Sequence, residues 1–207
     1  SIFLHNLRGS ANGLLKRFDT AVECYTNALR LNPNYAAIYN NLGNVFKEKG
    51  EIELAKNNYK QAIRIKPNYA EAYYGFGLTL EKNEEFLFAI KNYQNALINK
   101  PNYPEVFFNL GNVYRKSGDY KLAIKNYKNA IKLKKNYYEA YCNLGNSKKD
   151  LADVKSAKFY YKKALKINPK DVETMWNMHG VSISIDEAIK WLSECLNAED
   201  GCLKAKL

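Results

Sequence analysis

Residues 36–69 read AAIYNNLGNVFKEKGEIELAKNNYKQAIRIKPNY, and this 34-residue stretch sets the pattern for the rest of the 207-residue chain. When the sequence is displaced along itself by 34 residues, its small residues superimpose without a gap. The glycine column consists of Gly9, Gly43, Gly77, Gly111 and Gly145. The first alanine column consists of Ala21, Ala55, Ala89, Ala123 and Ala157. A fixed period of this length is typical of a stack of similar supersecondary units.

Four further columns keep the same register. The first tyrosine column is Tyr25, Tyr59, Tyr93, Tyr127 and Tyr161, and the second alanine column is Ala28, Ala62, Ala96, Ala130 and Ala164. The second tyrosine column is Tyr35, Tyr69, Tyr103 and Tyr137, and the proline column is Pro33, Pro67, Pro101 and Pro169. Lys135 replaces proline in the fourth unit. Because proline cannot continue a helix, its column marks the turn into the next unit.

Each unit is expected to hold two helices. The first, helix A, carries the Leu-Gly pair, and the second, helix B, carries Ala, Tyr and Ala at intervals of four and three, which places these three on one helical face. Small residues let helices approach closely, and the tyrosine fills the space between them. We therefore expect the first tyrosine column to be a packing feature.

An early Leu-Gly, two alanines and a closing proline in a 34-residue period resemble the tetratricopeptide repeat (TPR) family over nearly the whole chain. The resemblance implies an all-α fold, a right-handed superhelical solenoid of antiparallel helix pairs. We expect one solenoid of about six repeats, at residues 2–35, 36–69, 70–103, 104–137, 138–171 and 172–200.

The end of the chain departs from the period. In the sixth repeat Ala188, Leu192 and Cys195 resume the helix B pattern about three residues early, which predicts a shortened turn between helices A and B. Residues 201–207 are expected to begin a further helix, because Leu203 and Leu207 are four apart. The chain therefore reads as a fragment of a longer protein.

In the TPR family helix A lines a concave groove, and positions two, five, six and nine of each repeat face the ligand, counting Ala36 as position one. Position six holds Asn41, Asn109, Asn143 and Asn177, with a gap at Gly75; position nine holds Asn44, Asn112 and Asn146, with a gap at Leu78. This ladder is similar to that of the O-linked N-acetylglucosamine transferase repeats, whose stacked amides hold the backbone of an extended peptide. A carboxamide both donates and accepts, so it suits a peptide unit of any sequence. The alternative is that these amides are ordinary repeat consensus and bond only to water or to neighbouring turns.

Positions five and two add further candidates. Position five supplies Tyr74, Phe108 and Trp176, which would give a bound peptide apolar contact area or would be buried against a neighbouring helix. Position two holds Glu71, Glu105, Glu139 and Glu173, which would select a basic peptide or simply favour the helix dipole. Glu105, Asn40 and Asn109 also stand where family members that grip chaperone tails carry Lys or Arg, so that clamp is missing.

The net charge of +11 is concentrated in one region. Residues 121–170 contain 14 lysines and three acidic residues, whereas the rest of the chain balances at 18 against 18. We expect a basic ridge on the outer face of two B helices, formed by Lys121, Lys125, Lys128, Lys132, Lys155, Lys162 and Lys166. Such a ridge attracts polyanions. Almost no arginine accompanies it, which favours a solvated, solubilising face over a nucleic-acid interface.

No catalytic constellation or phosphate-binding loop is found, and neither a cofactor nor a metal site is expected. The four cysteines form no C-x-x-C pair, which favours free thiols and a cytoplasmic location. No apolar run approaches the roughly 20 residues of a membrane span.

The function predicted from the sequence is a non-enzymatic scaffold that binds an extended peptide or a partner helix in its groove. One alternative is the substrate-recruiting arm of a larger transferase whose catalytic domain follows Leu207. A second is an adaptor that binds a polyanion or a membrane surface through the basic ridge. The terminal repeats do not resemble polar caps, which leaves self-association through the solenoid ends open.

Overall fold

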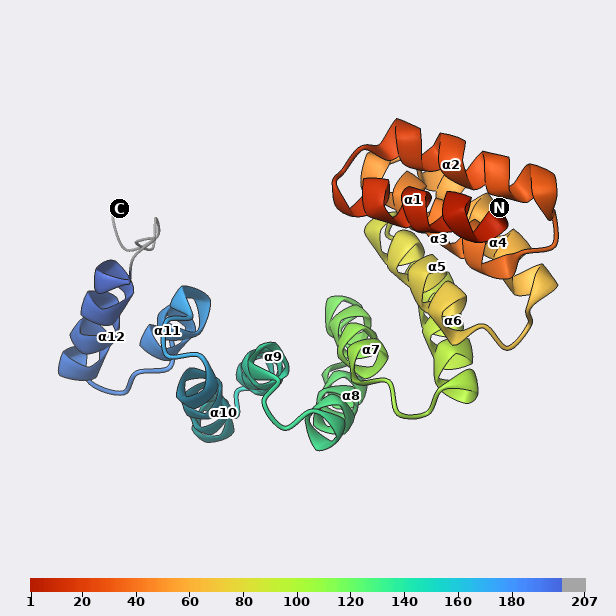
Figure 1. Ribbon diagram of the computed structural model, residues 1–207. Helices are drawn as coiled ribbons and strands as arrows, with labels where there is room; N and C mark the ends of the chain where they lie inside the picture. Colours follow the sequence, from red (N-terminus) through yellow and green to blue (C-terminus); the bar gives the residue numbers. More distant parts are fainter. Residues whose placement is uncertain (199–207) are drawn as a thin grey trace. The chain divides into compact units, whose positions relative to one another are not determined.

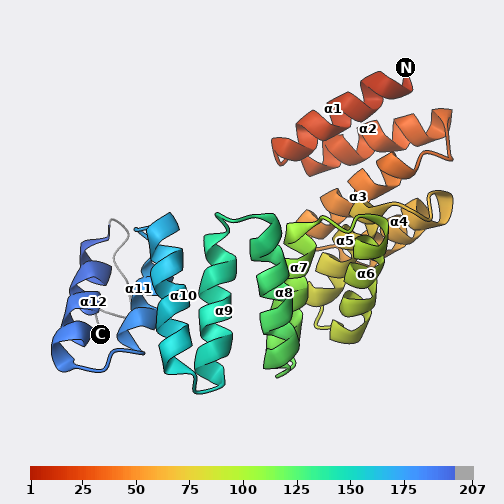
Figure 2. The ribbon, with the colours of Figure 1, turned by 90° about the horizontal axis from the view of Figure 1, so that it is seen from below.

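The computed structural model describes residues 1–198, in which twelve α-helices follow one another as antiparallel pairs (Figures 1 and 2). Within this range no strand occurs, so the predicted all-α fold is confirmed. The A helices are α1 (Ile2–Leu14), α3 (Ala36–Lys49), α5 (Ala70–Lys82), α7 (Pro104–Lys116), α9 (Tyr138–Asp150) and α11 (Val172–His179). The B helices are α2 (Phe18–Leu31), α4 (Ile52–Ile65), α6 (Phe86–Asn99), α8 (Tyr120–Leu133), α10 (Val154–Ile167) and α12 (Ile185–Asn197). The helix expected at residues 201–207 lies outside the described residues.

The chain divides into two compact units, Ser1–Asn102 with α1 to α6 and Tyr103–Leu207 with α7 to α12. Within each unit every A helix packs against the B helix of its own repeat, and α2, α4, α8 and α10 also pack against the A helix that follows them. Successive A helices also touch, as α3 touches α5 in the first unit and α7 touches α9 in the second. Each unit thus presents a surface formed by A helices alone.

The repeated columns form the core of each unit. Tyr59, Tyr93, Tyr127 and Tyr161 are fully buried, and so are the alanines on either side of them. The packing role predicted for the first tyrosine column is therefore confirmed. A Cβ atom added at Gly43 would lie 2.7 Å from the ring of Tyr59, and one added at Gly111 would lie 2.5 Å from the ring of Tyr127. The glycine column is fixed because the tyrosine ring of the same repeat occupies the space of a side chain.

The proline column is not what ends the B helices. Helix α8 ends at Leu133, the position equivalent to Ile65 and Ile167 in the helices that proline follows, although Lys135 replaces proline there. Pro104 lies at the start of α7, where its missing N–H costs nothing.

In the sixth repeat helix A is short, whereas the turn between helices A and B is not. Helix α11 has eight residues, against 13 or 14 in the other A helices, and α12 begins at Ile185 after the five-residue segment 180–184. The predicted shortened turn is therefore wrong. Ser182 Oγ donates to the Met178 carbonyl over 2.9 Å, and Ser184 Oγ accepts from the Glu187 N–H over 3.2 Å. These two serines satisfy backbone groups at both ends of the segment and so allow the early break.

Candidate functional site

The predicted ligand-facing positions lie on the A helices, and we call the surface they form within one unit its A face. In the first unit it belongs to α1, α3 and α5, and in the second to α7, α9 and α11. Most of its asparagines are half-buried, whereas Asn44 is exposed and Asn146 is buried at 7% exposure.

The asparagines at position nine serve the tyrosines of the core. In three repeats the hydroxyl of the buried tyrosine on helix B donates to the Oδ1 atom of the asparagine on helix A, 15 residues earlier. The pairs are Tyr59 and Asn44 at 2.7 Å, Tyr127 and Asn112 at 2.8 Å, and Tyr161 and Asn146 at 2.7 Å. Burial raises the pKa of Tyr59 and of Tyr161 above the ordinary value, so these hydroxyls stay protonated and remain donors. The amide is thereby held in one orientation.

The two remaining complete repeats supply the acceptor differently. In the third repeat position nine is Leu78, and the Tyr93 hydroxyl donates to Glu81 Oε2, at position twelve, over 2.8 Å. In the first repeat Ser10 stands at position nine, and its Oγ lies 3.1 Å from the Tyr25 hydroxyl. A buried hydroxyl without a partner is costly, so each repeat provides one. Sequence reasoning missed this pairing, although the coincidence of Leu78 with Glu81 signals it.

Position six links the amides of the second unit into a network. Asn143 Nδ2 donates to Asn112 Oδ1 over 2.8 Å, and Asn112 Nδ2 lies 3.4 Å from Asn109 Oδ1. Two neighbouring A helices are therefore joined through three side-chain amides. Farther along, Asn177 Nδ2 faces the Cys142 sulfur at 3.8 Å. Part of the ladder thus bonds to itself, as the consensus alternative predicts.

In the first unit the ladder is shorter. Asn41 Nδ2 donates to Asn6 Oδ1 over 3.2 Å, and Asn6 was not among the predicted residues. The gap at Gly75 has a packing cause, because a Cβ atom there would lie 2.6 Å from the Tyr59 ring. In the first unit Asn44 is therefore the last asparagine of the ladder, because Gly75 and Leu78 follow at positions six and nine of the next repeat.

The predicted aromatic anchors are half-buried. The Tyr74 ring lies 6.1 Å from that of Tyr93, measured between centroids. Phe108 packs against Tyr127 and Tyr137 with centroids 6.0 and 5.0 Å apart. Trp176 lies 5.2 Å from the ring of His179. One side of each anchor is thus engaged in packing.

At position two, Glu71 forms an ion pair with Lys100 over 3.2 Å. Burial acts to raise the pKa of Glu71, but hydrogen bonds from its own backbone N–H and from Lys100 outweigh this and lower the pKa. This carboxylate therefore supports the first turn of its helix.

The seven lysines of the basic ridge are all exposed, four on α8 and three on α10. Within residues 1–198 none of the seven forms an ion pair, whereas Lys158 on α10 pairs with Glu187 at 2.6 Å. The lysines of the ridge therefore have no ion-pair partner in the part of the second unit that the structure describes.

Histidine, cysteine and acidic side chains are groups that can bind a metal ion or act as nucleophiles. In residues 1–198 no group of three His, Cys, Asp or Glu is placed to hold a metal ion. Cys24 and Cys142 are free thiols, and Cys24, Cys142 and Cys195 are all buried. Burial raises the pKa of Cys142 to about 11, which keeps its thiol protonated. None of the helices in this range has both the length and the apolar character needed to cross a membrane.

Stacked antiparallel helix pairs with an inner row of polar residues define a helical-repeat protein. Two family descriptions match: "TPR repeat" at residues 14–50, 43–84, 88–117 and 111–151, and "Tetratricopeptide repeat" at residues 138–171. Because the matches cover most of the chain, it belongs to the TPR family. TPR repeats are protein-interaction scaffolds and are typically not catalytic.

Solved TPR proteins share the fold. MamA is 27% identical, with a TM-score of 0.73, over 80% of this chain and 96% of its own. YrrB, described as a TPR protein with an unusual peptide-binding site, is 23% identical with a TM-score of 0.72, over 88% of this chain and 95% of its own. The pilF protein of Pseudomonas aeruginosa is 18% identical with a TM-score of 0.86, over 99% and 95%. A comparison with curated protein sequences gave no match.

Proposed function

We propose that the A faces of this TPR scaffold bind the backbone of an extended peptide through the amides of positions six and nine. The observation that carries the proposal is the fixing of position-nine amides by core tyrosines, seen at Asn44 in the first unit and at Asn112 and Asn146 in the second. An amide held in place before binding loses little conformational freedom when a ligand arrives.

The fixed amides leave defined groups for a partner. Because Asn146 Oδ1 accepts from Tyr161, its Nδ2 group is the end left to donate, and Asn44 is in the same situation. Asn143 uses its Nδ2 on Asn112, which leaves its Oδ1 as an acceptor. Within residues 1–198 none of these three remaining groups makes a hydrogen bond. In the second unit, a donor on Asn146 and an acceptor on Asn143 therefore project from the same helix, α9, as the N–H and C=O groups of an extended peptide require.

The half-buried aromatics support the same function. Phe108 has one side packed on Tyr127 and Tyr137, which holds the ring rigid. A rigid ring contributes apolar contact area to an interface at a small entropy cost. The description of YrrB as a TPR protein with a peptide-binding site is in keeping with this use of the fold.

The test compares two triple variants. A displayed peptide library is selected on the purified chain, and the affinity of the recovered peptides is measured for Asn41→Ala/Asn109→Ala/Asn143→Ala. The control, Asn57→Ala/Asn99→Ala/Asn129→Ala, removes the same groups from B helices. We expect the A-face variant to weaken binding about 10-fold or more, because each lost backbone hydrogen bond contributes about 1 kcal/mol. Equal affinities for the two variants would contradict the proposal.

A second candidate, polyanion binding, is favoured by the seven lysines that lack an ion pair. A single-stranded oligonucleotide serves as the probe, and its affinity is measured at rising salt. Counterion release predicts a steep loss of affinity and a smaller salt slope after Lys121, Lys125, Lys128 and Lys132 become Gln. A flat salt response would exclude this candidate.

A further inference from the structure

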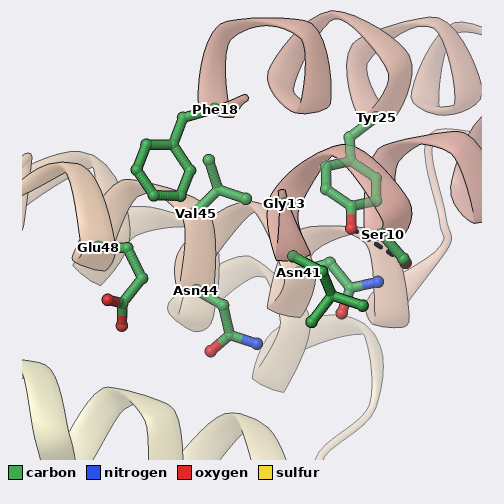
Figure 3. Close-up of a pocket in the computed structure, with 9 residues that line it drawn as sticks. Ser10, Gly13, Phe18, Tyr25, Asn41, Asn44, Val45 and Glu48 are labelled. Atoms are coloured by element: carbon green, nitrogen blue, oxygen red, sulfur yellow. Dashed lines mark hydrogen bonds between the residues drawn. The ribbon is translucent and has the colours of Figure 1, made fainter. Parts of the chain in front are cut away.

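The first unit contains a pocket of about 330 Å³ between α1, α2 and α3 (Figure 3). Its wall includes the apolar side chains Phe18 and Val45, the A-face amides Asn41 and Asn44, and the carboxylate of Glu48. In Figure 3 Phe18 and Val45 lie side by side, and Glu48 and Asn44 extend from the same helix, α3. The pocket is thus apolar on one side and polar on the other.

The pocket owes its space to one glycine. Position twelve is Gly13 in the first repeat, whereas repeats two to five place a long charged side chain there. Those side chains belong to Lys47, Glu81, Arg115 and Lys149. A Cβ atom at Gly13 would meet only Val45, at 3.7 Å, an ordinary van der Waals distance. Packing therefore does not demand glycine here, and the volume that a side chain would occupy is left open.

The lining selects a particular shape and charge. Phe18 and Val45 offer contact to an aliphatic chain, and Glu48 is the charged residue that lines the pocket. Glu48 is paired with its neighbour Lys47 at 3.3 Å, but its side chain is 61% exposed, and such surface pairs contribute little. A chain of methylene groups that ends in a cation matches this arrangement, and lysine and arginine have that structure.

We propose that this pocket binds a lysine or arginine side chain of the peptide held on the A face of the first unit. The inference rests on the proposed function, because Asn41 and Asn44 belong both to the A face and to the pocket lining. A peptide backbone bonded to these amides lies at the pocket, so that one of its side chains enters between Phe18 and Glu48. The partner is accordingly a peptide with a basic residue at one defined position.

The first experiment uses three blocked pentapeptides, acetyl-Ala-Ala-X-Ala-Ala-amide, in which X is lysine, norleucine or glutamate. Norleucine keeps the aliphatic stem of lysine without the ammonium group. Binding to the full chain is followed by the backbone NMR signals of Gly13, Phe18 and Val45. We expect the lysine peptide to bind about 5-fold more tightly than the norleucine peptide and about 10-fold more tightly than the glutamate peptide.

Glu48→Gln should reduce the preference for lysine over norleucine to about 2-fold or less. The variant removes the carboxylate that attracts the ammonium group, and solvent and salt screen the attraction from more distant charges. Glu23→Gln is the matched control, because it removes the same charge from an exposed site on α2 and should change nothing. Equal affinity of the unaltered chain for the lysine and norleucine peptides would overturn the inference.

A second pair of variants fills the pocket. Gly13→Lys introduces the residue that the second repeat has at this position and should abolish the signal shifts at Phe18 and Val45. Thr26→Lys adds the same charge on α2, at the position equivalent to Lys60, Lys128 and Lys162, and should leave binding unchanged. Retained binding in Gly13→Lys, with its circular dichroism unaltered, would overturn the inference.

The outcome is separable from that of the proposed function. If peptides depend on the A-face asparagines but not on the identity of X, the pocket inference fails and the proposed function stands. If the lysine peptide shifts the pocket signals while the asparagine variants keep full peptide affinity, the pocket inference stands and the backbone contacts fail.

Discussion

The two units have cores built from the same residue columns, but their A faces differ. Tyr59 and Tyr161 are equally buried between alanines of the same columns. The second unit carries linked amides on α7 and α9, whereas the first has Gly75 and Leu78 in place of amides and opens a pocket at Gly13. The columns of tyrosine and alanine that hold the helices together are constant, whereas the residues of the A face vary, at Gly75 for packing against Tyr59 and at Gly13 without a packing constraint.

The helix ends differ in the same way. In the first unit α1 to α6 begin without an N-cap side chain that accepts a hydrogen bond from the first turn. In the second unit the N-cap side chains of four helices accept a backbone N–H, namely those of Asp119, Asp153, Asp171 and Ser184. Because repeats stabilise one another by stacking, the first unit forms the same helices without these caps.

The largest effect is expected from closing the gap in the first unit. Gly75→Asn restores the ladder but places a Cβ atom 2.6 Å from the Tyr59 ring, so α5 must move away. We expect the free energy of unfolding of the first unit to fall by about 3 kcal/mol. Denaturant titration with hydrogen exchange resolved by unit measures it. In the control, Gly13→Asn, the nearest contact is 3.7 Å and the change should stay below about 1 kcal/mol. A stable Gly75→Asn variant would show that the gap is not set by packing.

A smaller effect is expected from giving the second unit the arrangement of the third repeat. Asn146→Leu copies Leu78 and leaves the buried Tyr161 hydroxyl without its acceptor, because position twelve is Lys149 instead of glutamate. The loss should be about 1–3 kcal/mol in thermal or denaturant unfolding. Adding Lys149→Glu copies Glu81 and should recover most of it. Absence of this rescue would refute the pairing of position nine with position twelve.

The smallest effect concerns the N-cap of α10. Asp153 accepts from the Ser156 N–H at 3.2 Å and pairs with Lys148 at 3.0 Å. The hydrogen bond from Lys148, followed by that from Ser156, lowers the pKa of Asp153 from 3.8 to about 2. A carboxyl group whose pKa is lower in the folded state than in the unfolded state stabilises the fold at every pH above the unfolded-state pKa. This contribution is lost as the pH falls from about 4 through 2.

Asp153→Ala should therefore lower the melting temperature by roughly 2 °C at neutral pH. The difference from the unaltered chain should shrink as the pH falls below about 4 and vanish only below about pH 2. Asp153→Asn keeps an acceptor and should lose less. A difference that is independent of pH would contradict the role of the charge.

The fold could be predicted from the sequence because the core columns are strictly periodic. The packing of Tyr59 on Gly43 follows from residues that recur in repeats one to five. The hydrogen bonds of the candidate site could not be predicted in the same way, because they connect residues of different columns and no single column shows them. The carboxylate of Glu81 replaces an amide three positions away, and Gly13 matters through the side chain it lacks. The shortened turn predicted for the sixth repeat is wrong because the pattern of α12 shows where that helix lies but not where α11 ends.

The hydrogen bond of the core tyrosine also constrains the order in which repeats can diverge. Leucine at position nine leaves the tyrosine hydroxyl without an acceptor unless glutamate already stands at position twelve. The change to leucine is therefore harmful before the change to glutamate and neutral after it. A design that chooses the residue of each column independently leaves a tyrosine hydroxyl without an acceptor wherever it combines Leu78 of one repeat with Lys149 of another. A consensus repeat designed from this chain should therefore carry over positions nine and twelve together, as one inherited unit.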